Sequence, residues 1–530
     1  MRKITLILLG VLYIGSLHAS SGPVDSLAIK YGNSIESTDL SKHLHILASD
    51  SFLGRETGQL GQKMAAEYIS NQFASFNIKP LKNSNVKEGY YQRFPLELQH
   101  PQGASMNSAG VKYEFINDFY YFPGFEDLNI STKELLFLGY GIEDKAYNDY
   151  GSLDVEGKIL VVFAGEPMDK KGRSLITGGN NASQWTTNWR LKEKIAKEKK
   201  AAALIIISED YQTNVDNWRH FIEKPSLKLI LEEDTVKSIK LPTFYISPNL
   251  ATKLFESLGK KGSMDKIQKK IGRKKNPVSH TLDVAFKISM NREVENLSSE
   301  NVLGFIEGTD KKDEILIITA HYDHLGVKDE VVFNGADDDG SGTVAVIEMA
   351  EAFALAKKNG HGPRRSVLFM PVAGEEKGLL GSEYYVKNPI FPLENTIANL
   401  NIDMIGRVDT QHTGDPNYVY LIGADKLSSE LHEISSKTNE NYTNLKLDYT
   451  YNDPNDPNRF YYRSDHYNFA SNNIPVIFYF TGIHEDYHKA TDTVDKIDFE
   501  KMEKITKLVF FTAWNLANRE DRIVVDKIEE

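Results

Sequence analysis

Short apolar runs and amphipathic stretches alternate through the second half of the chain. Ile315–Ala320 is apolar enough for a buried central strand, and Thr343–Lys357 has the apolar spacing of a helix packed on a sheet. Similar patterns predict further strands and a closing helix, at Val302–Ile306, Ser366–Ala373, Thr396–Asp403, Tyr418–Ile422, Ile474–Phe480 and Lys504–Ala517. This alternation predicts an α/β fold, here a three-layer sandwich around a mostly parallel mixed sheet.

The first half of the chain has a different pattern. Asp39–Phe76 has helical periodicity, interrupted by the polar, glycine-punctuated loop Ser51–Gly58. After Tyr90 short β-type runs follow one another, which predicts a small β-rich domain at residues 131–280. The main domain then comprises residues 20–130 and 281–530. Within the insert, the basic run Lys260–Lys275 is expected to be a solvated helix with a loop.

Residues 1–19 have the features of a secretory signal peptide. Arg2 and Lys3 precede the apolar run Ile4–Leu17, and small residues follow at Ala19–Ser21. The run is shorter than the roughly 20 residues of a transmembrane helix, which favours a cleaved signal over a retained anchor. The mature protein is therefore expected to be exported, to the periplasm or the medium, without stable insertion in a membrane.

Composition narrows the chemistry further. The 530 residues include 62 Lys plus Arg and 74 Asp plus Glu, a net charge of −12, which argues against nucleic acid as a partner. Cysteine is absent, which excludes disulfides, cysteine zinc sites, iron–sulfur clusters and thiol nucleophiles. Any bound metal must therefore be held by His, Asp and Glu. The oligomeric state stays open.

Charged residues gather where the predicted strands end. In chain order these positions carry His321-Tyr322-Asp323-His324, Glu375-Glu376, Asp403 and His488, and the acidic loop Asn334–Gly342 precedes the helix Thr343–Lys357. In open α/β sheets, functional sites form beyond the carboxyl ends of the strands. One edge of the predicted sheet therefore collects histidines and carboxylates.

Such a cluster requires bound cations. Carboxylates gathered without basic partners repel one another and are costly to bury. Histidine combined with carboxylates suits zinc, with manganese or cobalt as substitutes. The set offers more ligands than one tetrahedral site needs, which points to two metals that share a bridging carboxylate.

Several motifs resemble those of one known family. His321-Tyr322-Asp323, Gly335–Gly342, Glu375-Glu376, Asp403 and Tyr487-His488 together resemble the di-zinc M28 family of metallopeptidases, the aminopeptidase type. The loop through Gly58 is similar to an amino-terminal motif of exported members, and Leu138–Ile142 with Asp154–Ile159 resembles the protease-associated (PA) domain often inserted in these enzymes. The resemblance covers most of the chain. It implies a zinc-exopeptidase fold, two zinc ions per chain and peptide substrates.

The resemblance also implies a role for each matching residue. The expected zinc ligands are His321 and Asp403 for one ion, Glu376 and His488 for the other, and Asp338 as the bridge. Asp323 would orient the His321 ring, as carboxylates behind metal ligands commonly do. Glu375 would be the general base that takes a proton from the attacking water. Tyr487 would donate a hydrogen bond to the oxyanion.

A second zinc motif overlaps the last of these ligands. His484-Glu485-Asp486-Tyr487-His488 fits the His-Glu-x-x-His pattern of zincin peptidases, in which a helix presents both histidines and Glu485 would be the base. Here the segment follows a strand and runs into the turn-like Lys489–Thr493, without the apolar positions of a buried helix. We therefore favour the M28 arrangement and expect His484 and Glu485 to shape the rim of the site.

Three functions fit the sequence. The favoured one is an exported zinc aminopeptidase that hydrolyses amino-terminal residues with a water bridged by two metals. A carboxypeptidase or a glutaminyl cyclase on the same scaffold is the alternative, although cyclases usually have Trp where Tyr487 stands. A non-catalytic binding protein is disfavoured, because metal binding alone does not need Glu375.

Neighbouring polar residues have structural interpretations that compete with functional ones. His324 is expected to be a polar neighbour of the site rather than a further ligand. Arg463–His466 resembles a pocket-lining segment of the family. Asp465 and His466 could equally stabilise the fold, and the sequence does not decide between the two.

Overall fold

The chain folds as two compact units. The computed structural model describes residues 24–527 except 83–88, 101–103, 123–126, 189, 232–240, 262 and 292, so the predicted signal peptide lies outside the described residues. One unit combines Met1–Phe94 with Ser299–Glu530, and the other is Pro95–Ser298. The second unit extends beyond the predicted insert, residues 131–280, at both ends.

A mixed sheet with the order β12-β16-β13-β17-β20-β18-β19 forms the centre of the first unit. Its strands are β12 (Gly304–Ile306), β13 (Lys311–His321), β16 (Arg365–Val372), β17 (Thr396–Ile402), β18 (Tyr418–Ile422), β19 (Lys446–Asp448) and β20 (Val476–Phe480). Strands β16, β13, β17 and β20 run parallel, whereas β12 is antiparallel to β16, and β18 is antiparallel to β20 but parallel to β19. Strands β16, β17, β18 and β20 are buried throughout, which explains their largely apolar sequences.

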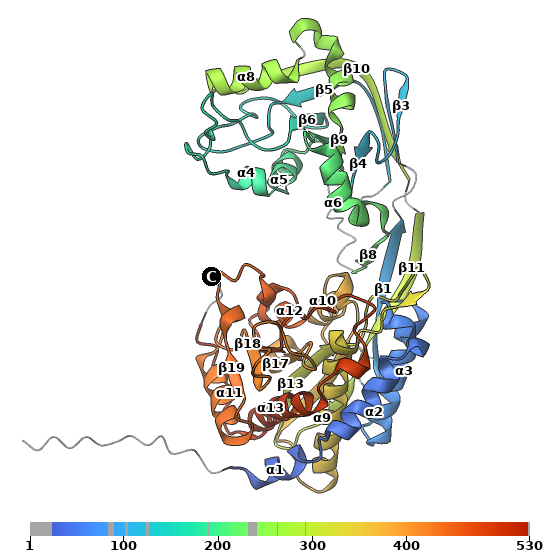
Figure 1. Ribbon diagram of the computed structural model, residues 1–530, viewed down its shortest axis with the longest axis vertical. Coiled ribbons are helices and arrows are strands. Elements are labelled where there is room, and N and C mark those ends of the chain that lie inside the picture. The colour runs from blue at the N-terminus through green and yellow to red at the C-terminus, as the bar shows by residue number, and fades with distance from the viewer. Residues whose placement is uncertain are drawn as a thin grey trace, which may run out of the picture. The chain divides into compact units, whose positions relative to one another are not determined.

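Helices cover both faces of this sheet (Figure 1). Ile317 of β13 packs in one apolar cluster with Tyr385 of α10 (Leu380–Lys387) and Phe469 of α12 (His466–Ala470). On the other face, the ring of Phe369 in β16 meets Phe353 of α9 (Gly342–Lys358), with 5.7 Å between ring centroids. The three-layer α/β sandwich predicted from the sequence is therefore confirmed.

The other helices of the first unit complete these layers. They are α1 (Ser26–Gly32), α2 (Ser37–Leu47), α3 (Leu60–Ser75), α11 (Ser429–Tyr442) and α13 (Phe499–Asn518). The hairpin of β14 (Val327–Lys328) and β15 (Val331–Val332) lies between β13 and α9 in the chain. Among the helices of the described residues, none combines the length and the apolar character needed to cross a membrane.

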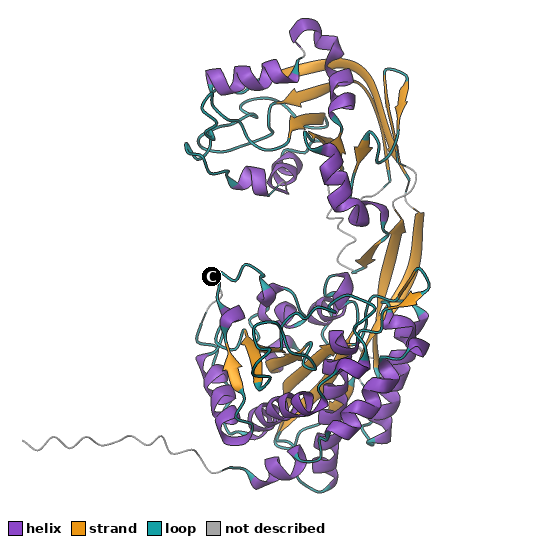
Figure 2. Cartoon of the chain, viewed as in Figure 1, coloured by secondary structure: helices purple, strands orange, loops and turns teal. Residues whose placement is uncertain are grey.

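The second unit contains its own mixed sheet, with the order β3-β2-β10-β5-β6-β7-β9-β4. The strands are β2 (Ser105–Ser108), β3 (Val111–Tyr113), β4 (Phe119–Tyr120), β5 (Leu128–Leu138), β6 (Ile159–Phe163), β7 (Ala203–Ile207), β9 (Thr243–Ile246) and β10 (Ser279–Met290). Strands β5, β6, β7 and β9 are parallel neighbours. The helices are α4 (Gln184–Thr187), α5 (Arg190–Glu198), α6 (Tyr211–Glu223), α7 (Pro248–Phe255) and α8 (Met264–Lys274). The unit thus holds more helix than a β-rich insert was expected to have (Figure 2).

A separate sheet with the order β11-β1-β8 contains both chain crossings between the units. Its strands are β1 (Tyr91–His100), β8 (Ser226–Leu229) and β11 (Glu293–Val302). The boundary between the units falls within β1, after Phe94, and within β11, after Ser298. The sequence pattern predicts these boundaries at residues 131 and 280, inside the second unit, because long strands that run through a domain boundary carry no turn residues to mark it.

Candidate metal centre

The parallel strands of the first unit bring the predicted site residues to one edge of the sheet. Ala320 of β13 lies opposite Pro371 of β16, and His321 lies opposite Val372. Strand β16 leads to the short helix η5 (Glu375–Lys377), and β17 leads directly to Asp403. Because the carboxyl ends of parallel strands meet at the same edge, residues far apart in the chain become neighbours here.

Backbone hydrogen bonds fix the acidic turn η4 (Ala336–Ser341), which carries Asp338 at the start of α9. The N–H groups of Asp337 and Asp338 both donate to the carboxylate of Asp492, at 3.1 Å. The carboxylate of Asp339 accepts from the backbone N–H of His321 at 3.1 Å and from that of Met404 at 3.0 Å. Asp339 therefore ties the turn to the ends of β13 and β17, a role that the run of three aspartates did not reveal.

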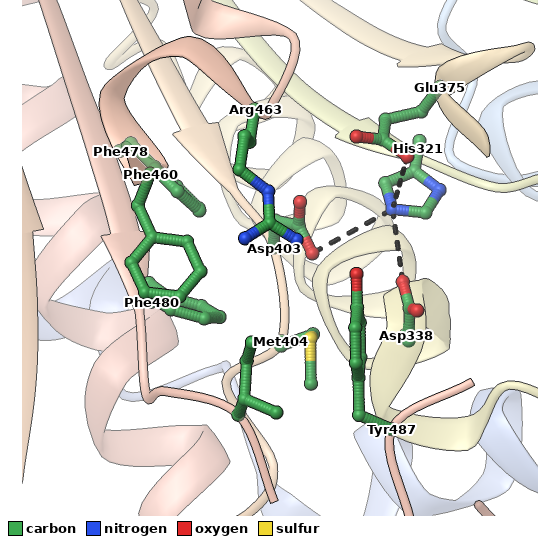
Figure 3. A pocket seen from close by; sticks show the side chains of 11 residues that line it. His321, Asp338, Glu375, Asp403, Met404, Phe460, Arg463, Phe478, Phe480 and Tyr487 are labelled. Atoms are coloured by element: carbon green, nitrogen blue, oxygen red, sulfur yellow. Dashed lines mark ion pairs between the residues drawn. The ribbon is translucent and has the colours of Figure 1, made fainter. Parts of the chain in front are cut away.

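Two histidine–carboxylate groups share Asp338. Its Oδ1 lies 3.3 Å from His321 Nε2, and its Oδ2 lies 3.1 Å from His488 Nε2. Asp403 Oδ1 is 3.7 Å from the same nitrogen of His321, and Glu376 Oε2 is 3.3 Å from that of His488. Figure 3 shows the ion pairs that converge on His321. All five predicted metal ligands thus lie in one site, with Asp338 between the two groups.

The orientation of His321 leaves one ring nitrogen available to a cation. Nδ1 lies 3.0 Å from the backbone carbonyl oxygen of Asp323, whereas the Asp323 carboxylate is 3.7 Å away. Because a carbonyl oxygen only accepts hydrogen bonds, Nδ1 carries a proton, and Nε2 is the ring nitrogen that faces Asp338 and could bind a cation. The Asp323 carboxylate instead accepts from Thr57 Oγ1 at 2.6 Å and from the Glu375 N–H at 3.3 Å.

The charges in this site fit bound cations. Burial, with the nearby charge of Asp338, raises the pKa of Glu376 to about 8, and burial raises the pKa of Glu375 well above its usual range. Burial also acts against ionisation of Asp338, but hydrogen bonds from His321 and His488 hold its pKa well below its usual range. Among the described residues, no Lys or Arg forms an ion pair with these carboxylates. The imidazole and carboxylate donors match the preferences of zinc, which would compensate the buried negative charge.

His324 lies beside the second group. Its Nδ1 is 2.8 Å from Glu376 Oε1 and 3.8 Å from Asp338 Oδ2. Burial lowers the pKa of His324 to about 4, so the ring is neutral near pH 7. His324, Asp338 and Glu376 offer ligand atoms close enough to hold one ion, as do His321, Glu375 and Asp403. The expectation that His324 is a neighbour rather than a ligand stays a prediction.

Arg55 is an important residue that the sequence analysis did not single out. Its guanidinium donates to the backbone carbonyl oxygens of Leu47 (2.8 Å), Tyr322 (2.7 Å), Asn334 (2.7 Å) and Gly335 (2.9 Å). The side chain is 1% exposed. It joins the end of α2 to the residue that follows His321 and to the segment that leads into the acidic turn. A lone arginine between the glycines of the loop Ser51–Gly58 was the available signal.

Beside the carboxylates, the site opens into a pocket with an apolar wall. This wall consists of Met404, Phe460, Phe478, Phe480 and Ile483. Figure 3 shows its methionine and its three phenylalanines. Tyr487 stacks on the ring of His488, with 3.8 Å between centroids, and its hydroxyl group points toward the carboxylates. The guanidinium of Arg463 lies over the ring of Phe460 at 4.9 Å. The pocket thus has a charged side and an apolar side.

The residues that follow Arg463 support the pocket from beneath. Asp465 accepts a hydrogen bond from Ser382 Oγ at 2.5 Å, and burial raises its pKa to about 7. His466 stacks on Phe478, with 4.7 Å between ring centroids. Of this segment, Arg463 alone lines the pocket among the described residues. The contacts of Asp465 and His466 therefore favour the fold-stabilising interpretation.

The His-Glu-x-x-His segment forms a turn and not a helix. His488 has a φ of 58°, which lies outside the right-handed helical region. The side chain of Glu485 is 75% exposed, near Arg407, and His484 contacts Asp337 instead of the metal ligands. The helical face on which a zincin presents both histidines is therefore missing, as the sequence context predicted.

Comparison with known proteins places part of the chain in a family. Residues 301–513 match peptidase family M28. A probable leucine aminopeptidase from Arthroderma otae is 29% identical over 213 residues, which are 39% of this chain and 55% of the relative. A probable zinc metalloprotease from Pyrenophora tritici-repentis is 28% identical over 265 residues, 41% of this chain and 51% of the relative. The chain thus spans about half the length of the curated relatives it matches.

A solved structure shares the fold over most of the chain. An aminopeptidase from Aneurinibacillus sp. strain AM-1 aligns with a TM-score of 0.51 and 18% identity, and the alignment covers 94% of this chain and 98% of that one. At this identity the likeness shows the fold alone. It extends through both units, while the assignment of the second unit as a PA domain stays a prediction.

Proposed function

We propose that the chain, whose residues 301–513 match peptidase family M28, is a zinc-dependent aminopeptidase that removes the first residue of peptides. The observation that carries the proposal is Asp338, whose two carboxylate oxygens face His321 and His488 at 3.3 and 3.1 Å. A carboxylate shared between two ligand groups is the arrangement of a two-metal site. The names of the relatives, leucine aminopeptidase and zinc metalloprotease, support the same class.

Two zinc ions fit the donors of this site. The residues that would hold them are His321 and Asp403 for one ion, Glu376 and His488 for the other, and Asp338 for both. Zinc bound there supplies a Lewis acid that polarises the scissile carbonyl group. The chain itself supplies the proton transfers and the orientation of the substrate.

Glu375 is placed to act as the general base. Its Oε2 lies 3.9 Å from His321 Nε2, and its side chain lines the pocket. The hydrogen bond from its N–H to Asp323 fixes the start of η5, which holds the carboxylate at this position. Burial raises the pKa of Glu375, and a carboxyl group with a raised pKa can take a proton from water and pass it to the leaving amine near neutral pH.

The pocket favours a free amino terminus followed by an apolar side chain. The carboxylates of Glu375 and Asp403 attract the protonated amino group, and the wall around Phe460 and Phe480 accepts the side chain of the first residue. The hydroxyl group of Tyr487 is available to donate a hydrogen bond to the carbonyl oxygen as it gains charge. Large apolar first residues should therefore be the best substrates.

Export is a second part of the proposal. It is supported by Arg2, Lys3 and the apolar run Ile4–Leu17, which have the order of a signal peptide. Mass spectrometry of the protein from its own cells should find an amino terminus near residue 20. A chain that retains Met1 would contradict cleavage.

Metal replacement tests the two-zinc site directly. The protein is stripped with a chelator, and zinc is added back while the hydrolysis of leucine p-nitroanilide is followed. Activity should be lost on stripping and should reach its maximum as the second equivalent of zinc binds. Full activity with one equivalent would contradict the two-metal proposal, and activity that survives complete stripping would contradict a zinc enzyme.

A further inference from the structure

The second unit contains a cavity that the proposed peptidase function does not use. Its volume is about 900 Å³, and residues of α5, α6, β7 and β9 line it. Ile206 of β7, Tyr245 of β9 and Tyr120 of β4 line it. The rings of Tyr120 and Tyr245 stack, with 4.8 Å between centroids and 7° between planes. A cavity of this size and partly aromatic lining is typical of ligand sites.

Helix α6 presents an aromatic stripe to this cavity. Asn214, Trp218 and Phe221 recur at helical spacing and all line it. Trp218 is 47% exposed and Phe221 is 58% exposed, although both are large apolar side chains. Their rings lie 5.7 Å apart, and Trp218 meets the edge of the Phe122 ring at 6.3 Å. Aromatic rings gathered on one exposed helix face mark a contact surface.

Helix α5 presents a cationic stripe from the other side. Arg190, Lys194 and Lys197 lie at helical spacing, line the cavity and are exposed, while Ala196 on the opposite side of the helix is buried. Glu193 is the one acidic residue among the described lining residues. The lining of the cavity is therefore positively charged, whereas the whole chain has a net charge of −12. We call the cavity with its two stripes the aromatic–basic cleft.

The inner end of the aromatic–basic cleft is built by Lys192. Its Nζ donates to the carbonyl oxygens of Tyr140 (2.6 Å), Phe163 (3.0 Å) and Gly165 (2.6 Å), so all three of its N–H groups are used by the backbone. Lys192 therefore shapes the cleft at the carboxyl end of β6. Ser208, which follows β7, lines the same end. Carboxyl ends of adjacent parallel strands are where α/β sheets form binding crevices.

From this geometry we propose that the aromatic–basic cleft binds an acidic peptide segment that carries an aromatic or large aliphatic side chain. The side chain packs among Trp218, Phe221 and Tyr245, since aromatic pairs gain from ring contacts at 4.5–7 Å. The flanking carboxylates pair with Arg190 and Lys194. The cleft is thus a second peptide site, which needs no free amino terminus and lies within the second unit alone.

Binding of blocked peptides tests this proposal on the full-length, zinc-loaded protein. The probe is a fluorescein-labelled Asp-Glu-Phe-Asp-Glu peptide with no free amino or carboxyl terminus, so the proposed aminopeptidase site has no amino group to bind. Two analogues replace the acids by lysines or the Phe by Ala. Fluorescence anisotropy should show the acidic Phe peptide binding at least about tenfold more tightly than either analogue, a difference of about 1.4 kcal/mol. Added salt should weaken it, because exposed charges are screened.

Matched variants locate the binding. Trp218→Ala, and Arg190→Glu combined with Lys194→Glu, should each weaken the acidic Phe peptide at least tenfold. The controls are Leu153→Ala, which truncates another exposed side chain of the same unit, and Lys266→Glu combined with Lys270→Glu, which makes the same charge change on α8. The control variants should bind the acidic Phe peptide as the parent protein does. All of the variants should hydrolyse leucine p-nitroanilide at the parent rate. Equal binding of the lysine peptide, no binding of any peptide, or an equal loss in the controls would overturn the proposal.

Discussion

His484 Nε2 lies 3.3 Å from Asp337 Oδ2, and both side chains are fully buried. The Nδ1 of the same ring accepts a hydrogen bond from the backbone N–H of Asp486 at 3.2 Å. Both ring nitrogens of His484 therefore have partners. The ring links the loop that leads to His488 with the acidic turn that carries Asp338. The first histidine of the His-Glu-x-x-His segment thus holds the site together from outside the metal centre.

Because His484 contacts Asp337 and not the metal ligands, Glu375 and not Glu485 is expected to be the general base. Glu375→Gln should keep zinc and fold but lower kcat by roughly 10²–10⁴-fold, as expected for a lost general base. Glu485→Gln should retain activity within about twofold, because a surface substitution of this kind rarely perturbs a site. The measurement is steady-state hydrolysis of leucine p-nitroanilide by both variants. The opposite pattern, activity lost in Glu485→Gln alone, would restore the zincin hypothesis.

Removal of Asp338 should empty the metal centre. Asp338→Ala leaves His321 and His488 without their shared partner, so zinc content should fall and thermal stability should fall with it, since metal binding is coupled to folding. Zinc per chain is measured after dialysis, and unfolding is followed by calorimetry. The control is Asp313→Ala, which removes an exposed carboxylate of the same unit. Two zinc ions retained in Asp338→Ala would show that the bridge is assigned wrongly.

Arg55 should act on zinc affinity without touching zinc. Lysine keeps the positive charge of Arg55, but its three N–H groups on a single atom cannot reach all four of the carbonyl oxygens that the guanidinium binds. Arg55→Lys should therefore weaken zinc binding by about 10–100-fold, the range seen when supports behind metal ligands are lost. Competition with a zinc indicator measures the affinity. Arg219→Lys, on an exposed helix face, is the matched control. An unchanged zinc affinity in Arg55→Lys would show that the hydrogen bonds of Arg55 do not support the metal centre.

The second unit should lose stability as the pH rises through 6. Asp149 accepts hydrogen bonds from the N–H groups of Tyr140 and Ile142 and from the hydroxyl group of Tyr147, yet burial raises its pKa from 3.8 to about 6. A carboxyl group whose pKa is higher in the folded protein than in the unfolded chain stabilises the folded state when the pH is below the unfolded pKa. This stabilisation is lost as the pH rises to the folded pKa. The unfolding free energy should therefore fall by about 2 kcal/mol between pH 4 and 7, most of it below pH 6.

Asp149→Asn provides the comparison for this pH dependence. The amide cannot ionise, so the variant should show a flatter profile between pH 4 and 7. Urea unfolding followed by tryptophan fluorescence is a suitable readout, because three of the four tryptophans lie in the second unit. Parallel profiles for parent and variant would show that another group is responsible.

The sequence predicts the sheet, and the convergence of the candidate site residues at one edge of it, for a physical reason. Ile315–Ala320 and its apolar counterparts identify the buried strands, and parallel strands bring their carboxyl ends together whatever their separation in the chain. That His321 and Asp403 lie close together therefore follows from the pattern alone. Which atoms meet does not follow from it. The family resemblance implies that Asp323 orients His321 with its carboxylate, but the backbone carbonyl oxygen lies closer to Nδ1, at 3.0 Å against 3.7 Å, because Thr57 engages the carboxylate.

The supports of the site were hidden for a related reason. Arg55, Asp339 and Asp492 act through hydrogen bonds to the backbone of distant segments, and such contacts leave no periodic signal. The same holds for α6, whose polar sequence gives a weak helical pattern although Val215 and Ile222 are buried. Residues that bind backbone atoms can be found in a structure but not in a hydrophobic pattern.

The proposal that the protein is an aminopeptidase is tested most directly by product analysis of a peptide and its acetylated form. The zinc-loaded protein is incubated with a Leu-initiated pentapeptide and with the same peptide acetylated at its amino terminus, and the products are followed by mass spectrometry. We predict stepwise loss of residues from the free amino terminus and no reaction of the acetylated peptide. Loss of residues from the carboxyl terminus of both peptides would contradict the account and identify a carboxypeptidase.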